Sequence, residues 1–319
     1  MKKKRILICG ASGFIGRNIF NALSQNSDLE VTGAYRSNPP SLIPAESLRR
    51  VNLTDPTSVD NLLSEGFDVI VQAAATTSGS KIIKEHPEIH VTDNAIMNSL
   101  IFRAAHQRKV PHVLFFSCTI MYEFGHRLLK ETDVDLNREL GDYFAAGWTK
   151  IYLEKQCEFY ARQGRTRYTV IRHSNIYGPH DKFDLEKSHV FGATINKVLN
   201  ATNGEITIWG TGEERRDLLY IDDLVRFVGM AMNRQKTSFE IFNVGRGETV
   251  SVRELVEKIV RQSGKDLKIV NDLSKPTIKD SSITIDIGKA REQLGWQPEI
   301  NIDEGIRKTI EWYKKHYTT

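Results

Sequence analysis

The arrangement of apolar and polar positions divides the chain into short, wholly apolar runs and longer segments with a helical period. The first apolar run covers residues 6–9, and apolar positions 14, 15, 19 and 23 follow at the spacing of one helix face. A run of this kind is typical of a strand buried on both sides, and the second pattern is typical of an amphipathic helix. The chain is therefore expected to begin with a strand, a turn and a helix.

The same alternation continues through the first half of the chain. We expect further strands near residues 30–35, 67–72, 112–116 and 167–172, and helices near residues 56–63, 87–106 and 142–162. Buried strands that alternate with helices predict a parallel sheet with helices on both faces. The predicted fold class is α/β, a doubly wound parallel sheet of Rossmann type.

A second, smaller lobe is expected after Gly178-Pro179, because these two residues interrupt the pattern. Residues 1–178 are predicted to form the first domain, and residues 179–319 an interleaved α/β lobe that binds substrate. Helices are expected near residues 188–201, 220–231, 251–263 and 303–317, and strands near 205–209 and 239–244. Ser251 and Glu254 have the spacing of a helix capping box. We expect about residues 218–247 to rejoin the first sheet.

Composition and charge exclude several classes of protein. The 319 residues are 40% hydrophobic and carry a formal net charge of only +4. The basic run at residues 2–5 precedes too few apolar residues for a signal peptide or a membrane span. Basic stripes with interleaved aromatics, metal-ligand spacings of histidine and paired cysteines are all missing from the sequence. We therefore predict a cytoplasmic protein without a nucleic-acid partner, a membrane partner or a metal ion.

Three glycines, at positions 10, 13 and 16, lie between the first strand and the first helix. A diphosphate must approach the backbone more closely than a Cβ atom allows, and the amides at the helix start face its charge. The spacing is one residue longer than in the commonest dinucleotide motif, and an ordinary glycine-rich turn is the alternative. The predicted diphosphate site consists of Gly10, Ser12, Gly13, Phe14, Ile15 and Gly16.

The end of the second strand indicates which dinucleotide is bound. An acidic residue there would favour NAD, but the sequence has Tyr35-Arg36-Ser37. Because the Arg36 guanidinium can pair with a 2′-phosphate, we predict NADP (NADPH) as the cofactor, with NAD as the less favoured choice. A solvated loop arginine is the alternative explanation.

The next two strand ends supply further candidate cofactor contacts. Small side chains there would let the ribose and phosphates pass close to the sheet, although simple tight packing is the alternative. Asp55, directly before Pro56, is instead expected to cap a helix. The residues predicted to lie beside the cofactor are Asn52, Leu53, Ala73, Ala74 and Ala75.

These motifs resemble the extended short-chain dehydrogenases/reductases, the NAD-dependent epimerase/dehydratase family, and within it the GDP-L-fucose synthase group of nucleotide-sugar 4-ketoreductases. The resemblance covers nearly the whole chain. Its specific motifs are Asn175-Ile176-Tyr177-Gly178-Pro179-His180-Asp181 and Ser188-His189-Val190. Its general motifs are the glycine turn, residues 51–55, 73–79, 209–212, Arg216 and residues 295–296.

The family resemblance implies a tyrosine and a lysine four residues apart on one helix face. The tyrosine exchanges a proton with the substrate oxygen, and the lysine binds the nicotinamide ribose and lowers the pKa of the tyrosine. Lys150 is present, but Ala146 stands in the tyrosine position, and Tyr143 is a turn too far away. Either an original tyrosine was replaced by design, or the natural protein lacks this acid and works differently or only binds its ligands.

Two further positions depart from the family pattern. Cys118 stands where a serine or threonine polarises the substrate oxygen, with Thr119 as an alternative donor and a buried core thiol as the other interpretation of Cys118. His189 matches the histidine of the C3/C5 epimerising pair, but Ile120 replaces its cysteine partner. We therefore expect no 3,5-epimerase activity. Thr119-Ile120 also replaces the acidic pair of dehydratases.

The resemblance implies the remaining site residues. Two cations, Lys197 and Arg216, match the positions that contact the nucleotide diphosphate, with either Arg215 or Arg216 expected to be only a surface charge. Residues 279–282 replace a basic segment of the family, which leaves the base and the sugar open. The further cofactor contacts are His173, Asn175 and Ile176, and the substrate contacts are Ser117, Asn175, His189, Lys197, Trp209 and Arg216.

The leading hypothesis is an NADPH-dependent reduction of the C4 keto group of a nucleotide-linked 4-keto-6-deoxy sugar, with a GDP-sugar favoured. The alternatives are a nucleotide-sugar epimerase with tightly bound NAD and a catalytically silent binding protein. The helices near residues 87–106 and 142–162 are long enough to form a four-helix bundle across a homodimer axis. The alternative is that they only cover the sheet.

Overall fold

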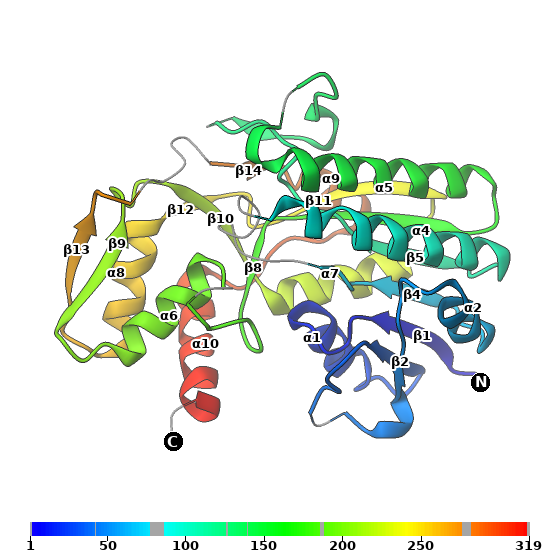
Figure 1. The fold of residues 1–319 in the computed structure, drawn as a ribbon, viewed down its shortest axis with the longest axis horizontal. Helices are drawn as coiled ribbons and strands as arrows, with labels where there is room; N and C mark the ends of the chain where they lie inside the picture. Colours follow the sequence, from blue (N-terminus) through cyan, green and yellow to red (C-terminus); the bar gives the residue numbers. More distant parts are fainter. Residues whose placement is uncertain are drawn as a thin grey trace.

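A parallel sheet of seven strands forms the centre of the larger lobe (Figure 1), in the order β11-β7-β5-β4-β1-β2-β3. The structure is a computed structural model that describes residues 2–41, 43–76, 86–125, 127–138, 140–185, 188–275 and 282–317. Every neighbouring pair in the sheet is parallel. Its strands are β1 (Lys4–Cys9), β2 (Leu29–Tyr35), β3 (Leu48–Arg50), β4 (Val69–Gln72), β5 (His112–Phe116), β7 (Arg167–His173) and β11 (Phe239–Val244).

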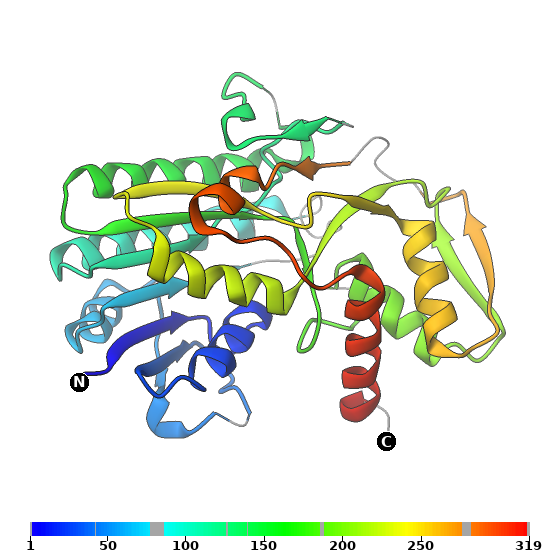
Figure 2. The ribbon, with the colours of Figure 1, turned by 180° about the vertical axis from the view of Figure 1, so that it is seen from behind.

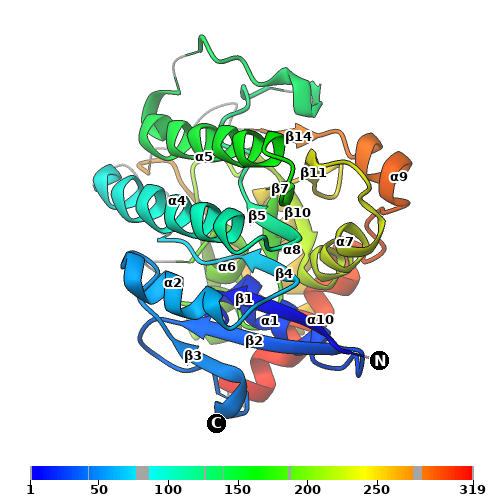
Figure 3. The same ribbon diagram turned by 90° about the vertical axis from the view of Figure 1, so that its right-hand side faces the viewer.

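Helices cover both faces of this sheet, which explains why its central strands are buried. β4 and β5 are buried at every position. Figure 3 shows α2, α4 and α5 on one face and α1 and α7 on the other. The predicted doubly wound Rossmann-type fold is confirmed. The helices are α1 (Phe14–Leu23), α2 (Pro56–Ser64), α4 (Thr92–Gln107), α5 (Phe144–Arg162) and α7 (Ile221–Arg234).

The smaller lobe packs small sheets against helices beside the carboxyl ends of the large sheet (Figure 2). Ser251 caps α8 as predicted, since its hydroxyl accepts from the Glu254 amide while the Glu254 carboxylate accepts from the Ser251 amide. The strands outside the large sheet are β6 (Leu128–Leu129), β8 (Asn175–Tyr177), β9 (Glu205–Trp209), β10 (Arg215–Tyr220), β12 (Thr249–Ser251), β13 (Lys268–Asp272) and β14 (Thr284–Ile285). The remaining helices are α6 (Val190–Asn200), α8 (Val252–Ser263), α9 (Gly288–Leu294) and α10 (Ile302–Tyr317).

The chain returns to the first sheet after it has entered the smaller lobe. β11 pairs with β7 along its whole length, in parallel, and α7 packs beside α1. The return of the strand near residues 239–244 to the first sheet is therefore confirmed. The lobe boundary at residue 178 stays a prediction.

Several strands outside the large sheet were not predicted from the sequence: β6, β8, β10, β12, β13 and β14. The longest of them is β10, which runs from Arg215 to Tyr220 between β8 and β12, shortly after the turn expected at residues 210–212. The strand begins with three charged residues, so its sequence lacks the apolar run of a buried strand. Its extended conformation is stabilised instead by pairing with strands that are distant in the sequence. Two expected helices also begin later, because residues 87–90 and 141–143 form short 3-10 turns before α4 and α5.

Within the described ranges, no helix combines the length and the apolar character needed to cross a lipid bilayer. The longest, α5, has 19 residues and includes Lys150, Glu154 and Lys155.

Candidate active site

The turn after β1 is tightly packed on its protein side. Gly10 has φ +80°, and a Cβ atom there would lie 2.8 Å from the backbone nitrogen of Ala74. A Cβ atom at Gly16 would collide with the Gly10 carbonyl group. At Gly13, in contrast, a Cβ atom would meet only the Gly10 oxygen, at 3.3 Å. The glycines therefore bring the strand, the turn and α1 close together and leave the space in front of Gly13 open.

The start of α1 is suited to an anion. Gly13 is the N-cap residue and offers no side-chain hydrogen bond, and the first turn contains no acidic residue. The amides of that turn and the positive end of the helix dipole therefore remain available to a ligand. Ser12 is exposed, and Phe14 and Ile15 are half-buried beside it. These residues fit a dinucleotide diphosphate.

The other predicted cofactor positions follow the ends of β2, β3 and β4. Arg36 is exposed, and its guanidinium lies 3.8 Å from the Asp93 carboxylate of α4. Ala73 and Ala74 are half-buried and Ala75 is exposed at the end of β4. Leu53 belongs to the hydrophobic core. The helix cap at Asp55 is confirmed, because its carboxylate accepts a 2.7 Å hydrogen bond from the Ser58 amide.

Lys150 of α5 reaches the carboxyl end of β5. Its ammonium group donates a 2.7 Å hydrogen bond to the Phe116 carbonyl oxygen and lies 4.9 Å from the ring centroid of Phe115. Burial lowers the pKa of Lys150, while the nearby Cys118 and Glu154 act in the opposite direction. The lysine is thus held at the sheet edge that faces the smaller lobe.

Four of the predicted site residues converge at this point. Burial raises the pKa of Cys118, an effect that the positive charge of Lys150 opposes. Burial also lowers the pKa of His173 to about 4, with contributions from Lys150 and His189. The His173 Nδ1 atom lies 2.7 Å from the Ser174 carbonyl oxygen. The ends of β5 and β7 and the helix α5 therefore meet in one site.

The position of the expected tyrosine lies next to this cluster. Ala146 is half-buried and precedes Lys150 by one helical turn, on the same face of α5. Tyr143 lies before the helix begins, with its ring edge-to-face against Phe124. Among the described residues, the groups that shift the pKa of Lys150 are two cysteines and Glu154, and none is a phenol. A methyl group thus occupies the place where the family resemblance implies the acid.

Two cations of the smaller lobe, Lys197 and Arg216, are predicted substrate contacts. The Lys197 ammonium lies 5.5 Å from the ring centroid of Trp209, which is exposed at the end of β9. Burial lowers the pKa of Arg216, and Tyr143 of the larger lobe opposes this shift, so the two side chains lie near each other across the lobes. Arg215 instead donates hydrogen bonds to Thr249 of β12. Of the two arginines, Arg216 faces the larger lobe.

Asn175 and Ile176 belong to β8, at the junction of the lobes. The Asn175 side chain is exposed and donates a 3.1 Å hydrogen bond to the Asp217 carbonyl oxygen, and Ile176 is 8% exposed. Thr119 is half-buried beside Cys118. Residues 77–79 and 279–281 lie outside the described residues.

Ser117 differs from its expected role. We expected its hydroxyl to contact substrate, but the residue is 1% exposed, and the hydroxyl donates a 2.5 Å hydrogen bond to Glu154. Because the first residue after β5 still points into the protein, its side chain finds a partner on α5. Ser117 is therefore a buried structural residue in this structure and not a substrate contact.

The partners of Ser117 were not predicted from the sequence. Glu154 and Arg172 form a buried ion pair directly behind the cluster. Two signals could have drawn attention to them: Glu154 follows Lys150 by one helical turn, and Arg172 is a charged residue directly after the apolar pair Val170-Ile171. Neither signal identifies the partner, which comes from another element.

Comparison with known proteins identifies the class to which this fold and site belong. The model of the NAD dependent epimerase/dehydratase family matches residues 6–245, and the chain belongs to this family. GDP-L-fucose synthase of Escherichia coli (strain K12) is 29% identical over 98% of this chain and 97% of its own length. A putative UDP-glucose 4-epimerase of Methanocaldococcus jannaschii is 28% identical, over 98% of this chain and all of its own length.

A solved structure has the same fold over its whole length. The UDP-glucose 4-epimerase of Thermotoga maritima, determined with UDP-glucose, aligns with a TM-score of 0.85 and 26% identity. The alignment covers 98% of this chain and 99% of the other. The family resemblance inferred from the sequence is thus confirmed.

Proposed function

We propose that the protein is an NADPH-dependent reductase of the C4 keto group of a nucleotide-linked 4-keto-6-deoxy sugar, with GDP as the nucleotide. The observation that carries this proposal is the convergence of Lys150 and Cys118 at the sheet edge that also holds the glycine turn. Full-length similarity to a GDP-L-fucose synthase supports the choice of substrate. Calorimetric titration with NADPH and with a GDP-sugar tests it, and absence of binding by either ligand would contradict it.

Residues of the larger lobe account for cofactor binding. The amides of the turn at Gly13 would hold the diphosphate, and the Lys150 ammonium would bind the nicotinamide ribose hydroxyls. Arg36 would pair with the 2′-phosphate. When bound, the reduced cofactor supplies the hydride. Burial and the nearby positive charge of Lys150 keep His173 neutral at the edge of this site.

The smaller lobe accounts for the substrate. Lys197 and Arg216 are half-buried cations, which suits them to the diphosphate of a nucleotide sugar. Cys118 or Thr119 would donate a hydrogen bond to the keto oxygen. The proton for that oxygen would come from position 146 when a phenol stands there. His189 would contact the sugar from the start of α6 without exchanging a proton at C3 or C5, because Ile120 provides no partner group.

Replacing Arg36 by alanine should weaken NADPH binding by roughly tenfold to a hundredfold, the usual size for loss of one charge-assisted hydrogen bond. Calorimetric dissociation constants of parent and variant measure the effect. NADH is the internal control, because it lacks the 2′-phosphate and should bind both proteins equally. Equal losses for the two dinucleotides, or no loss for NADPH, would show that Arg36 does not select NADP.

Nucleotide-sugar epimerisation with tightly bound NAD is the second candidate. It is favoured by the full-length structural similarity to a UDP-glucose 4-epimerase. Such an enzyme retains its dinucleotide between turnovers, whereas a reductase must exchange NADP for NADPH. Mass spectrometry of the purified protein after denaturation separates them: bound NAD at one equivalent supports the epimerase, and its absence supports the reductase.

We further propose that α4 and α5 pair across a two-fold axis to form a four-helix bundle in a homodimer. The two helices lie side by side on one face of the sheet (Figure 1) and expose apolar side chains, including Ile96 (41%), Tyr152 (53%) and Phe159 (56%). Clustered exposed apolar residues of this kind are typical of an interaction surface.

Phe159→Glu should convert this dimer to a monomer, because it introduces a charge into the centre of an apolar contact. Size-exclusion chromatography with light scattering measures the mass. Leu273→Glu is the matched control, since Leu273 is 73% exposed on the smaller lobe and should tolerate the charge. A monomeric parent protein, or dissociation by both variants alike, would contradict the proposed interface.

A further inference from the structure

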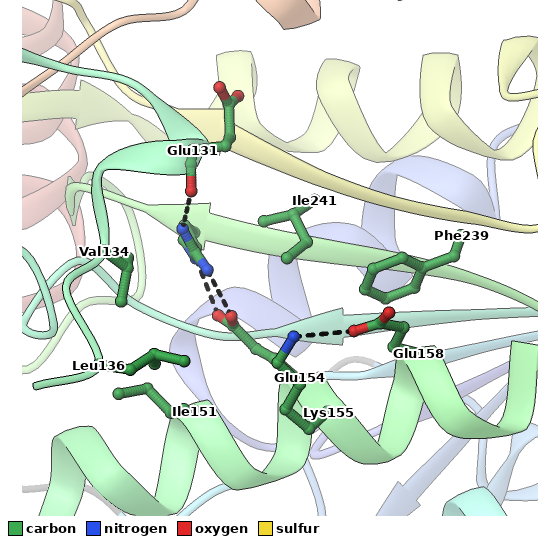
Figure 4. Close-up of a pocket in the computed structure, with 10 residues that line it drawn as sticks. Glu131, Val134, Leu136, Ile151, Glu154, Lys155, Glu158, Phe239 and Ile241 are labelled. Atoms are coloured by element: carbon green, nitrogen blue, oxygen red, sulfur yellow. Dashed lines mark hydrogen bonds and ion pairs between the residues drawn. The ribbon is translucent and has the colours of Figure 1, made fainter.

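The segment that follows β5 carries the two candidate donors, Cys118 and Thr119, and a buried ion pair lies directly behind it. Glu154 of α5 and Arg172 of β7 form this pair, with each side chain 5% exposed. Two parallel contacts join them: Arg172 Nη2 to Glu154 Oε2 at 2.6 Å and Nε to Oε1 at 3.0 Å. Figure 4 shows Glu154 pointing from α5 toward the strands of the sheet.

Both ends of the segment are attached to this pair. At one end, the Ser117 hydroxyl donates a 2.5 Å hydrogen bond to Glu154. At the other end, Arg172 donates a 2.9 Å hydrogen bond to the Tyr122 hydroxyl, which itself donates to the Asn243 side chain at 2.6 Å. The four residues between Ser117 and Tyr122 are thus held between two anchors that share one ion pair.

The pair also connects this segment to Lys150. Glu154 follows Lys150 by one turn of α5, and the Lys150 ammonium is bonded to Phe116, the residue directly before Ser117. On the other side, Arg172 donates a 2.8 Å hydrogen bond to the carbonyl oxygen of Glu131. Lys150, the segment that carries Cys118 and Thr119, and the carboxyl ends of β5 and β7 are therefore joined through a single set of hydrogen bonds.

Packing alone does not hold this pair in place. Glu154 and Arg172 line a cavity of about 190 Å³, together with apolar residues such as Leu136 and Phe239 (Figure 4). A buried ion pair is often no more stabilising than an apolar replacement of the same size, so its presence is weak support for a role in stability. Its directional hydrogen bonds reach Ser117 and Tyr122, at the two ends of the segment that carries Cys118 and Thr119. These bonds indicate that the ion pair fixes the position of this segment.

We propose that Glu154 and Arg172 are positioning residues that fix the Cys118–Thr119 segment relative to Lys150 for the reaction. The link to the reaction rests on the proposed function, whereas the positioning itself can be measured without cofactor or substrate. The two charges act on Cys118 with opposite sign: the Glu154 carboxylate raises the pKa of the thiol and the Arg172 guanidinium lowers it.

The thiol of Cys118 provides the measurement. Cys9 and Cys157 are 0% exposed, and Cys118 is the half-buried cysteine among the three in the chain. The pH dependence of alkylation by iodoacetamide therefore reports the pKa of Cys118, because the thiolate is the reactive form.

Glu154→Gln should lower this pKa by about one unit, because Arg172 then acts on the thiol without its counter-charge. Arg172→Met should raise it by a similar amount, and the double variant should return it close to the parent value. Glu158→Gln is the matched control, since Glu158 lies one turn further along α5 and pairs with Lys155 near the surface. An unchanged pKa in both single variants would overturn the proposal.

Two milder variants keep the proposal testable if a single charge replacement prevents folding. Ser117→Ala and Tyr122→Phe each remove one anchoring hydroxyl and leave both charges in place. Each should speed alkylation of Cys118, because the segment is released at one end, and alkylation at the parent rate in both would overturn the proposal.

Activity is a second, separable measurement. In an Ala146→Tyr background, these variants should lower kcat by roughly tenfold to a hundredfold, the size expected for a misplaced reacting group, with the KM for NADPH unchanged. A merely structural role would lower the melting temperature and leave kcat per folded molecule intact, which would count against positioning. Absence of turnover in the background itself would contradict only the proposed function, since alkylation does not depend on it.

Discussion

Ala146→Tyr should raise the rate of NADPH-dependent reduction of GDP-4-keto-6-deoxymannose by a factor of roughly 100 to 10,000, the usual contribution of a general acid. The new phenol would stand one helical turn before Lys150, on the same face of α5. The positive charge of the lysine would lower the pKa of the phenol and so ease proton transfer to the substrate oxygen. The fall in NADPH absorbance measures the rate.

Ala146→Phe is the control for this experiment, because it adds the ring without the hydroxyl group. It should show no gain over the parent protein. If the tyrosine variant is no faster than the phenylalanine variant, position 146 does not supply the proton. Tight binding of both ligands without turnover, even in the tyrosine variant, would instead favour a binding protein without catalytic activity.

Gly10→Ala should weaken NADPH binding by about a hundredfold or more, because it disturbs the turn that we propose holds the diphosphate. Two effects combine there. The backbone has φ +80°, and the added Cβ atom would lie 2.8 Å from the Ala74 backbone at the end of β4. The strand ends must move apart, which displaces the amides at the start of α1. Calorimetric titration of the folded variant with NADPH measures the loss.

Gly264→Ala separates crowding from backbone strain. Gly264 has φ +75°, almost the same as Gly10, but an added Cβ atom there would have no heavy atom within 4 Å. It lies at the end of α8 in the smaller lobe. This variant should lose a similar amount of stability from strain and bind NADPH like the parent. Equal losses of affinity in both variants would mean that the close approach of Gly10 to Ala74 is not what shapes the dinucleotide site.

The parts of the fold that sequence predicts well are those determined by local pattern. The strand at residues 112–116 has the predicted bounds, because all five positions are buried and the four from Val113 to Phe116 are apolar. Likewise, α1 begins directly after the glycine turn, where its apolar period begins. In contrast, β10 could not be predicted, because it starts with charged residues and is stabilised by pairing with β8 and β12.

The same distinction applies to the candidate site. Gly10 could be selected as a candidate from sequence, because the local pattern defines the turn in which it lies, and Lys150 could be selected through the family resemblance. The partners of Ser117 could not, because Glu154 and Arg172 meet only when α5 packs on the sheet. Tyr122 and Asn243 are 121 positions apart and still share a hydrogen bond. Long-range pairs of this kind leave no periodic signal in the sequence.

The return of β11 to the large sheet has a consequence for how the molecule folds. A fragment that ended at residue 178 would lack both β11 and α7, and would leave one face of its sheet uncovered around α1. A single hydrophobic core extends from Ile8 in β1 to Ile195 in α6 and Leu255 in α8. The two lobes therefore share one hydrophobic core, and a cut at residue 178 would expose apolar side chains on both sides of it.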